Sequence, residues 1–293
     1  MKTLLNIIKS CRPLLWLKTL WVMLLASYLA LNKLPPIKEF FFGFLVLGVL
    51  MWSGLYILND LSDIYVDKFH KEKKERPIIS GQLSKKTATI SASILISLSI
   101  ILSSLISFYF LLIIIFTLFN QLTYTLKPFR FKESANWDFI SCGMLGQILR
   151  FLAGWFLFTT SFNIPILGLI FVTLTKTSGF LFYRLHHYDL EKKLKYKSSV
   201  TTYNKDRIKI SAFALMFIAI ASFFLMLFND KFFNIENIGS LPYNLIYLTP
   251  IVLLIAPFYL KVIKNPNLYT NSYIRHVSYV LLIISLLVAL PLL

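Results

Sequence analysis

Cysteine and acidic residues are scarce in this chain. Only 2 of its 293 residues are cysteine, and only 13 are Asp or Glu. Cys11 and Cys142 lie in or beside apolar segments, so we expect neither a disulfide nor a cysteine metal site. Apolar segments run from one end of the chain to the other and leave no room for a separate soluble domain. We therefore expect one transmembrane domain over residues 1–293.

The composition is typical of a membrane protein. Hydrophobic residues make up 57% of the chain and the mean hydropathy is +0.70, which ordinary soluble domains do not reach. The first apolar run begins late, is long and lacks a small-residue cleavage site, so we do not expect it to be a cleaved signal. The prediction is an all-α integral membrane protein.

Nine apolar segments have about the length that a membrane-spanning helix requires, which is roughly 20 residues. The third and fourth segments are joined almost without a loop near Ser107. We expect all nine to be transmembrane helices. The predicted spans are residues 14–31, 40–58, 88–106, 108–124, 138–158, 164–185, 208–228, 244–262 and 274–292.

Basic residues alternate between the loops. The chain has 30 Lys and Arg residues, and the segments 68–86, 127–132 and 184–209 hold many of them. The connections near residue 107 and at 159–165 hold none. Because positively charged loops remain on the cytoplasmic side, we expect the N-terminus in the cytoplasm and the C-terminus outside a plasma (inner) membrane. This alternation explains the net charge of +17 without a nucleic-acid partner.

Three carboxylates follow the second predicted span. Asp60, Asp63 and Asp67 are spaced i, i+3 and i+7, which places them on one face of a helix, and Asn59 lies one turn before Asp63. Carboxylates at the edge of a bilayer are costly unless a cation compensates them. A solvated helix end would explain the basic residues nearby, but not three acidic residues on one face. Oxygen ligands at this density suit a Mg²⁺ ion that holds the phosphates of a substrate.

Basic side chains are concentrated between residues 68 and 86, directly after the three carboxylates. Among them, Lys73, Lys74 and Arg76 can contact phosphate oxygens. Pro77 and Gly81 predict a turn that leads into the third span. The expected site therefore combines metal-binding carboxylates with phosphate-binding cations.

Polar residues also lie at the end of the fourth span and inside the fifth. Tyr124 ends the fourth span, and Lys127, Arg130 and Lys132 follow it. For this group a phosphate contact and a basic loop that only orients the protein remain equally open. Arg150 lies deep in the fifth span, and an intramembrane arginine indicates a functional site. It can bind an anionic substrate or pair with a carboxylate. Asp138 is about 18 Å away along the same helix, so it is not a partner within that helix.

A polar patch ends the sixth span. Arg184, His187 and Asp189 are candidates for substrate binding, and an interfacial cap of basic and aromatic residues is the alternative. His186 and His187 are adjacent and cannot point the same way on a helix, so we do not expect a two-histidine metal site.

The segment from Asn59 to Asp67 resembles the N-D-x-x-D-x-x-x-D motif of the UbiA superfamily of intramembrane prenyltransferases. Residues 76–78 (Arg-Pro-Ile) and 80–81 (Ser-Gly) are also similar to the family pattern, and the resemblance covers nearly the whole chain. It implies a bundle of nine helices around a cytoplasmic-facing cavity. It also implies that the three motif carboxylates bind a diphosphate through Mg²⁺.

Within this superfamily, the chain is most similar to the polyprenyl-phosphate phosphoribosyltransferases of the decaprenyl-phosphate type. The resemblance implies that Lys18 and His70 join the substrate-binding residues. A departure from the aromatic-acceptor prenyltransferases is the lack of a second D-x-x-x-D pair after the sixth span, where Asp189 is followed by Lys193. The similar residues are Arg12-Pro13, Trp16, Lys18, His70, Lys73, Arg76-Pro77, Leu149-Arg150, Ala153-Gly154, Arg184 to Asp189, Val200 and Tyr203.

These patterns predict a Mg²⁺-dependent membrane transferase that uses a diphosphate-bearing donor and a polyprenyl lipid. The first hypothesis is transfer of a 5-phosphoribosyl group from phosphoribosyl diphosphate to a polyprenyl phosphate. The alternative is transfer of a polyprenyl group from its diphosphate to an aromatic acceptor, of the 4-hydroxybenzoate or quinone type, or to a glycerol phosphate. A membrane transporter is a third hypothesis, which the absence of a clear internal repeat disfavours.

Overall fold

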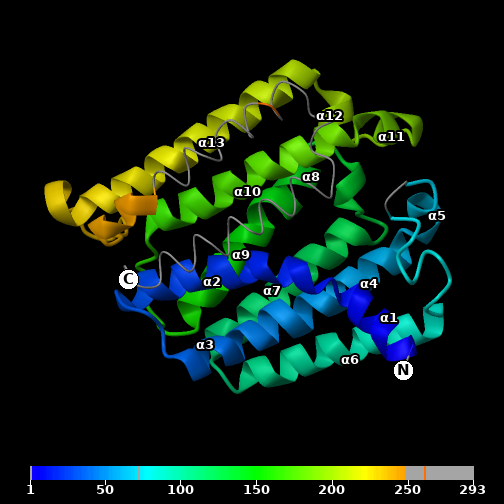
Figure 1. Ribbon diagram of the computed structural model, residues 1–293, viewed down its shortest axis with the longest axis horizontal. Helices are drawn as coiled ribbons and strands as arrows, with labels where there is room; N and C mark the ends of the chain where they lie inside the picture. Colours follow the sequence, from blue (N-terminus) through cyan, green and yellow to red (C-terminus); the bar gives the residue numbers. More distant parts are fainter. Residues whose placement is uncertain (1, 71–72, 249–260, 262–293) are drawn as a thin grey trace. The chain divides into compact units, whose positions relative to one another are not determined.

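The computed structural model describes residues 2–70, 73–248 and 261, and this part of the chain is helical without a β-strand. One isolated bridge pairs Ser134 with Lys197. Short 3₁₀ and π segments interrupt or extend several of the helices. The α-helices, which are labelled in Figure 1, are α1 Lys2–Cys11, α2 Trp16–Leu31, α3 Ile37–Phe44, α4 Trp52–Ser62, α5 Ile64–Asp67, α6 Lys85–Ser104, α7 Phe108–Thr125, α8 Trp137–Phe139, α9 Gly146–Phe156, α10 Ile166–His186, α11 Tyr188–Lys193, α12 Ser199–Thr202 and α13 Lys205–Phe228.

Seven helical segments of the described chain are long and apolar enough to cross a membrane. They coincide with the first seven predicted spans, and they make the protein an integral, multi-pass membrane protein. The eighth prediction, 244–262, lies mostly outside the described residues, and the ninth, 274–292, lies wholly outside them. The seven segments are Lys2–Leu31, Ile37–Ser62, Lys85–Ser104, Phe108–Thr125, Trp137–Phe156, Ile166–His186 and Lys205–Phe233.

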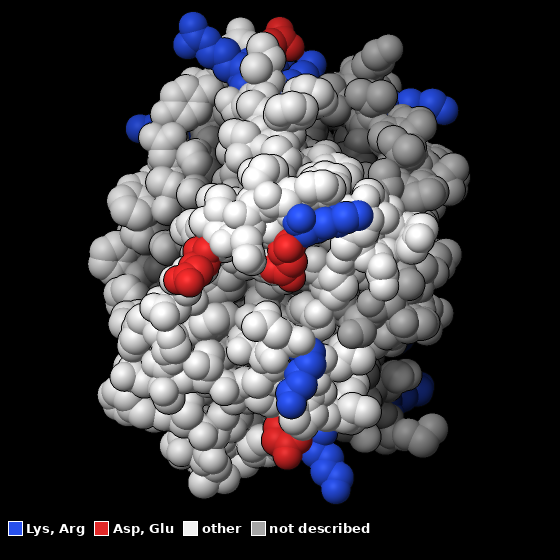
Figure 2. Space-filling model, turned by 90° about the vertical axis from the view of Figure 1, so that its left-hand side faces the viewer, with Lys and Arg blue, Asp and Glu red and all other residues white. Residues whose placement is uncertain are grey.

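Large apolar side chains on these helices are exposed on the protein surface. Phe116, Phe119 and Phe217 are 55%, 63% and 67% exposed. In the view of Figure 2, only a few Lys, Arg, Asp and Glu side chains are visible over a largely uncharged surface. Exposed apolar surface of this extent is expected where helices contact lipid chains.

The chain forms two compact units, which we describe separately. Unit 1 contains residues 1–31, 35–130 and 149–161. Unit 2 contains residues 32–34, 131–148 and those from 162 onward. The three motif carboxylates belong to unit 1, and the polar patch at the end of α10 belongs to unit 2.

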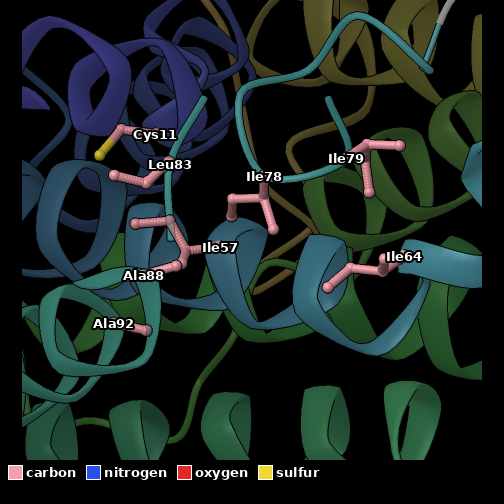
Figure 3. Close-up of a cluster of buried hydrophobic side chains, with 8 residues drawn as sticks. All are labelled: Cys11, Ile57, Ile64, Ile78, Ile79, Leu83, Ala88 and Ala92. Carbon is pink, nitrogen blue, oxygen red and sulfur yellow. The ribbon is translucent and has the colours of Figure 1, made fainter. Parts of the chain in front are cut away.

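A buried apolar cluster in unit 1 fixes the segment that follows the acidic motif. Ile78, Ile79 and Leu83 of this segment pack with Ile57 of α4 and Ile64 of α5, and Figure 3 shows the side chain of Ile78 directed toward α4. Burying such side chains contributes about 1.5–3 kcal/mol each. This packing holds the segment against α4, and it thereby holds the basic residues just before it near the carboxylates. The other members of the cluster are Cys11, Ala88 and Ala92.

Helices α2 and α9 approach closely at Gly154. The Ser27 hydroxyl donates a hydrogen bond to the Gly154 carbonyl oxygen at 2.9 Å. A Cβ atom on Gly154 would lie 2.5 Å from the Met23 carbonyl oxygen and 2.7 Å from its Cα atom. Because both atoms belong to a backbone, neither can move aside as a flexible side chain would. Small residues permit this kind of approach between membrane helices.

Gly154→Ala is therefore expected to lower the free energy of unfolding by about 1–3 kcal/mol, the usual cost of overpacking a core. Thermal unfolding of the purified protein in detergent measures the effect. Gly179→Ala in α10 is the matched control, because a Cβ atom there meets nothing within 4 Å. Equal melting temperatures for the two variants would contradict the close approach.

In unit 2, α10 and α13 form the main helix pair. The buried side chains of Leu181, Phe182 and Leu185 from α10 pack with Ile208 of α13 and Val200 of α12. This core places the end of α10, with its polar patch, beside α12. Elsewhere along the pair, the Ser178 hydroxyl donates a hydrogen bond to the Ala212 carbonyl oxygen at 2.7 Å.

Candidate functional site

The three motif carboxylates do not lie on one continuous helix, which corrects the prediction from their spacing. Helix α4 ends at Ser62, Asp63 adopts φ −104° and ψ 8°, and Asp67 is the last residue of the short helix α5. The chain nevertheless stays coiled, since the Asp67 N–H donates to the Asp63 carbonyl oxygen at 2.8 Å. Asp60, Asp63 and Asp67 are 0%, 7% and 1% exposed. The break still leaves all three carboxylates buried.

Two cations from the following segment, which the sequence predicted to bind phosphate, contact these carboxylates in the structure. One nitrogen of Arg76, Nη1, lies 2.8 Å from Asp60 Oδ1 and 3.2 Å from Asp67 Oδ2. The Lys73 ammonium lies 3.0 Å from the other oxygen of Asp67. Charges this deeply buried are stable only when they are paired. The two outer carboxylates of the motif therefore share one guanidinium.

Arg12 is a third cation of the site, and the sequence pattern gave it no role there. It follows α1 in the left-handed region, with φ 53° and ψ 62°. Its guanidinium forms an ion pair with Asp60 and stands over the ring of Tyr56, 5.1 Å from the centroid. The Arg12-Pro13 pair was the only sequence signal at this position. Its contact with a residue 48 positions away depends on how α1 packs.

Arg130 is the fourth cation, and it holds Asp63. Its Nη2 atom lies 3.1 Å from Asp63 Oδ1, and its Nη1 donates to the Ser62 hydroxyl at 2.9 Å and to the Thr125 carbonyl oxygen at 3.2 Å. It lies in the same basic loop as Lys127, which is exposed and for which the sequence left a phosphate contact and a role in orientation equally open. Tyr124 is half-buried near the end of α7. Sequence reasoning therefore chose the right loop, and the structure brings its second basic residue to the carboxylates.

The carboxylates have the chemistry that a divalent cation such as Mg²⁺ requires, but as they stand no three Asp, Glu, His or Cys side chains of the described residues are grouped closely enough to hold a metal ion. The position of Arg76 Nη1 shows that a positive group fits between Asp60 and Asp67. The second oxygen of Asp60, Oδ2, is buried and accepts no hydrogen bond from any described residue. Carboxylate oxygens are the ligands that Mg²⁺ prefers. Asp60, Asp63 and Asp67 would hold the ion, with Asn59 immediately beside them in the chain.

The other predicted residues of unit 1 differ in exposure. His70 is buried, and its N–H donates to the Asp67 carbonyl oxygen at 3.1 Å, so it belongs to the turn that follows the motif. Lys74 and Lys18 are exposed. The structure therefore brings His70 next to the acidic motif and leaves the two lysines at the surface.

Arg150 lies among aromatic and hydroxyl groups of unit 1. Its Nε atom donates to the Thr19 hydroxyl at 3.0 Å, and its guanidinium stacks over Trp52 at 3.6 Å from the ring centroid. Trp52, Tyr56 and Asp60 follow one another at steps of four residues along α4, so they share one face. The rings of Trp52 and Tyr56 are 5.7 Å apart. Arg150 therefore contacts the same face of α4 that carries Asp60. Along this face, Trp52 and Asp60 are about 12 Å apart by the helical rise.

The polar patch in unit 2 is an ion-pair network. Arg184 is buried and lies 3.3 Å from Asp138 and 3.0 Å from Glu191, and it donates to the Lys132 carbonyl oxygen at 2.8 Å. It therefore links the end of α10 to α8 and α11. The Ser199 N–H and hydroxyl both donate to Asp138, at 3.0 and 2.8 Å. The sequence named Arg184 but not its carboxylate partners.

His187 and Asp189 have different surroundings from Arg184. Helix α10 ends at His186, and His187 joins it to α11 with φ −94° and ψ 7°. The buried His187 ring places Nδ1 2.8 Å from the Tyr183 carbonyl oxygen. Asp189 is exposed. The three predicted residues of this patch therefore do not converge on one point.

Comparison with known proteins decides the family. The model described as the UbiA prenyltransferase family matches residues 17–272. This chain belongs to that family. The family prediction from the acidic motif is therefore confirmed.

Named relatives of this UbiA family member include 4-hydroxybenzoate octaprenyltransferases. The one from Vesicomyosocius okutanii is 28% identical over 284 residues, which is 93% of this chain and 95% of the relative. The one from Shewanella baltica is 35% identical over 79 residues, which is 27% of each chain. These relatives support the prenyl-transfer alternative better than phosphoribosyl transfer, the first hypothesis.

Solved structures show the same fold. A UbiA homologue from Archaeoglobus fulgidus, bound to GPP and Mg²⁺, matches 96% of this chain and 96% of its own with a TM-score of 0.73 and 18% identity. An apo UbiA homologue from Aeropyrum pernix covers 95% and 98% with a TM-score of 0.69 and 16% identity. The chain is thus an all-helical UbiA-fold membrane protein and a member of a transferase family.

Proposed function

We propose that the protein is a Mg²⁺-dependent prenyltransferase that moves a polyprenyl group from its diphosphate to an aromatic acid of the 4-hydroxybenzoate type. The observation that carries this proposal is the buried cluster of Asp60, Asp63 and Asp67 with basic side chains around it. Such a site can hold a diphosphate through both a metal and direct ion pairs. The relative from Vesicomyosocius okutanii, which matches 93% of this chain, bears the name of this activity.

The chain's own residues have distinct roles in this proposal. Asp60, Asp63 and Asp67 hold Mg²⁺, which when bound neutralises charge on the leaving diphosphate. Lys73 and Arg76 bind its oxygens. As the carbon–oxygen bond to diphosphate breaks, the allylic carbon gains cation character. A ring carbon of the acceptor forms the new carbon–carbon bond and then loses its proton.

Arg150 is the residue that we assign to the acceptor's carboxylate. It stacks on Trp52 and bonds to Thr19, so its guanidinium is held in a defined orientation inside unit 1. Trp52, on which it stacks, lies about 12 Å along α4 from Asp60. This separation leaves room for the aromatic ring and the reacting carbon between the two charged ends.

We place the carboxylate site on the cytoplasmic side of the membrane. The loops that hold Lys73, Arg76 and Arg130 are strongly basic, whereas the connections near residue 107 and at 159–165 hold no Lys or Arg. Positively charged loops are retained in the cytoplasm. The N-terminus is then cytoplasmic, and a water-soluble acceptor reaches the site from the cytosol.

Phosphoribosyl transfer is the second candidate, because segments such as Leu149-Arg150 resemble that branch. It requires a basic subsite for the ribose 5-phosphate. Arg184, a predicted substrate-binding residue at the end of α10, is the basic side chain considered for this subsite, and it has Asp138 and Glu191 as partners. The polar patch at the end of α10 therefore offers no evident phosphate subsite for this candidate among the described residues.

An assay of the purified protein distinguishes the two candidates. One reaction contains labelled polyprenyl diphosphate and 4-hydroxybenzoate, and the other contains labelled phosphoribosyl diphosphate and polyprenyl phosphate. We expect a labelled lipid product in the first reaction only, and none when EDTA is added. Product in the second reaction only would replace the proposal with phosphoribosyl transfer.

A further inference from the structure

Asp60 and Asp67 have arginine partners at the oxygens that would bind a metal. Arg76 Nη1 contacts both carboxylates, at 2.8 and 3.2 Å. Arg12 contacts the same oxygen of Asp60, Oδ1. With Lys73 on Asp67 and Arg130 on Asp63, four cations contact three carboxylates. The acidic motif is therefore already neutralised by the chain itself.

This arrangement affects how a divalent cation can bind. Two like charges a few ångströms apart repel each other, and a divalent ion doubles the repulsion that a univalent ion would meet. Arg76 lies between the carboxylates that the ion would join. Mg²⁺ can approach Asp60 and Asp67 closely only if the guanidinium of Arg76 moves away.

The displaced guanidiniums then need another anion. A buried or half-buried arginine that loses its carboxylate is costly unless it finds a new partner. Arg76 and Arg12 have 25% and 20% exposed side chains, so both reach solvent and can contact an incoming ligand. A diphosphate provides several oxygens, and bidentate pairing with guanidinium is strong.

We propose that Arg12 and Arg76 are exchange cations. They hold Asp60 and Asp67 in the ion pairs of this structure, and they move to the diphosphate of the donor when the divalent metal binds the carboxylates. Metal and diphosphate consequently bind with strong mutual dependence. The inference rests on the proposed function only in that the donor carries a diphosphate.

Thermodynamic linkage gives the proposal a measurable form. If diphosphate raises the affinity for metal by some factor, metal must raise the affinity for diphosphate by the same factor. Couplings between two sites on one protein are typically about 5- to 150-fold. We expect the wild-type coupling to lie in this range, and to depend on the two exchange cations.

Mn²⁺ binding to the purified full-length protein tests this dependence. The EPR signal of free Mn²⁺ gives the affinity with and without inorganic pyrophosphate, after correction with protein-free samples for chelation in solution. Arg76→Gln should bind Mn²⁺ alone about five-fold more tightly than the wild type or better, and its coupling should fall toward one. Arg76→Lys, which keeps the charge, should retain most of the coupling.

Lys68→Gln is the matched control, because Lys68 is an exposed cation of the same segment. It should bind Mn²⁺ and pyrophosphate as the wild type does. Arg12→Gln is the second test variant. Like Arg76→Gln, it should raise the affinity for Mn²⁺ alone and lower the coupling between Mn²⁺ and pyrophosphate. Melting temperatures identify any variant that does not fold.

Weaker or unchanged binding of Mn²⁺ alone by folded Arg76→Gln and Arg12→Gln would overturn the inference. Such a result would mean that both arginines only hold the metal-binding carboxylates in position. No turnover is needed for these measurements. A protein with coupled binding but no prenyl transfer would refute the proposed function alone, and one with prenyl transfer but no coupling would refute the exchange alone.

Discussion

Asp60→Asn is expected to reduce turnover by about 100-fold or more while the protein still folds. Asp60 is fully buried and contacts both Arg12 and Arg76. The amide has nearly the shape of the carboxylate but no charge, so it is a poor metal ligand. The metal supplies several kcal/mol of charge stabilisation, and each 1.36 kcal/mol changes the rate tenfold. Prenyl-transfer rates of the purified variant, at saturating Mg²⁺, measure the loss.

Asp63→Asn and Asp67→Asn should have effects of the same kind, because each is a proposed ligand of the same ion. Glu75→Gln is the control, since Glu75 is an exposed acidic residue of the neighbouring segment. It should leave the rate unchanged. Full activity of the Asp60 variant, or of the wild type in excess EDTA, would refute the hypothesis that the reaction requires a metal ion at these carboxylates.

Arg184→Ala is expected to destabilise unit 2 by about 3–5 kcal/mol, the usual cost of removing one partner from a buried ion pair. The substitution leaves Asp138 and Glu191 buried without their shared guanidinium. Its principal effect should be on folding, since α8, α10 and α11 lose their common contact. Thermal unfolding in detergent, together with the yield of monodisperse protein, measures this effect.

Arg207→Ala is the matched control for Arg184→Ala. Arg207 is an exposed residue near the start of α13, and its removal should change the melting temperature little. A stable Arg184→Ala protein whose KM for phosphoribosyl diphosphate rises strongly would contradict the structural role. That outcome would instead favour the second candidate function.

Much of the site was predictable because its carboxylates and two of its cations are close in sequence. The spacing of Asp60, Asp63 and Asp67 reflects the helical period, and Lys73 and Arg76 follow within one short segment. The break at Asp63 was not predictable, since no proline or glycine marks it. The helical spans followed from hydropathy alone, because a bilayer fixes both their length and their composition.

The remaining partners depend on tertiary packing. Arg130 and Asp63 are 67 residues apart, and nearly two whole membrane spans lie between Asp138 and Arg184 in the sequence. A single sequence gives the type of each residue but not which distant charge it meets. Arg184 was interpreted as part of a binding patch because its local neighbours are basic and polar. Its carboxylate partners became visible only in the structure.

The ion pair between Arg12 and Asp60 gives one arginine two successive roles during biosynthesis. Arg12 lies between α1 and α2, inside the first membrane-spanning segment, so it emerges from the ribosome well before Asp60. In the proposed topology its positive charge at that stage helps retain the N-terminus in the cytoplasm, and acidic residues contribute little to this orientation. Once α4 has been inserted, Asp60 neutralises the same charge. A tag or deletion that disturbs α1 would therefore affect both membrane insertion and the finished site.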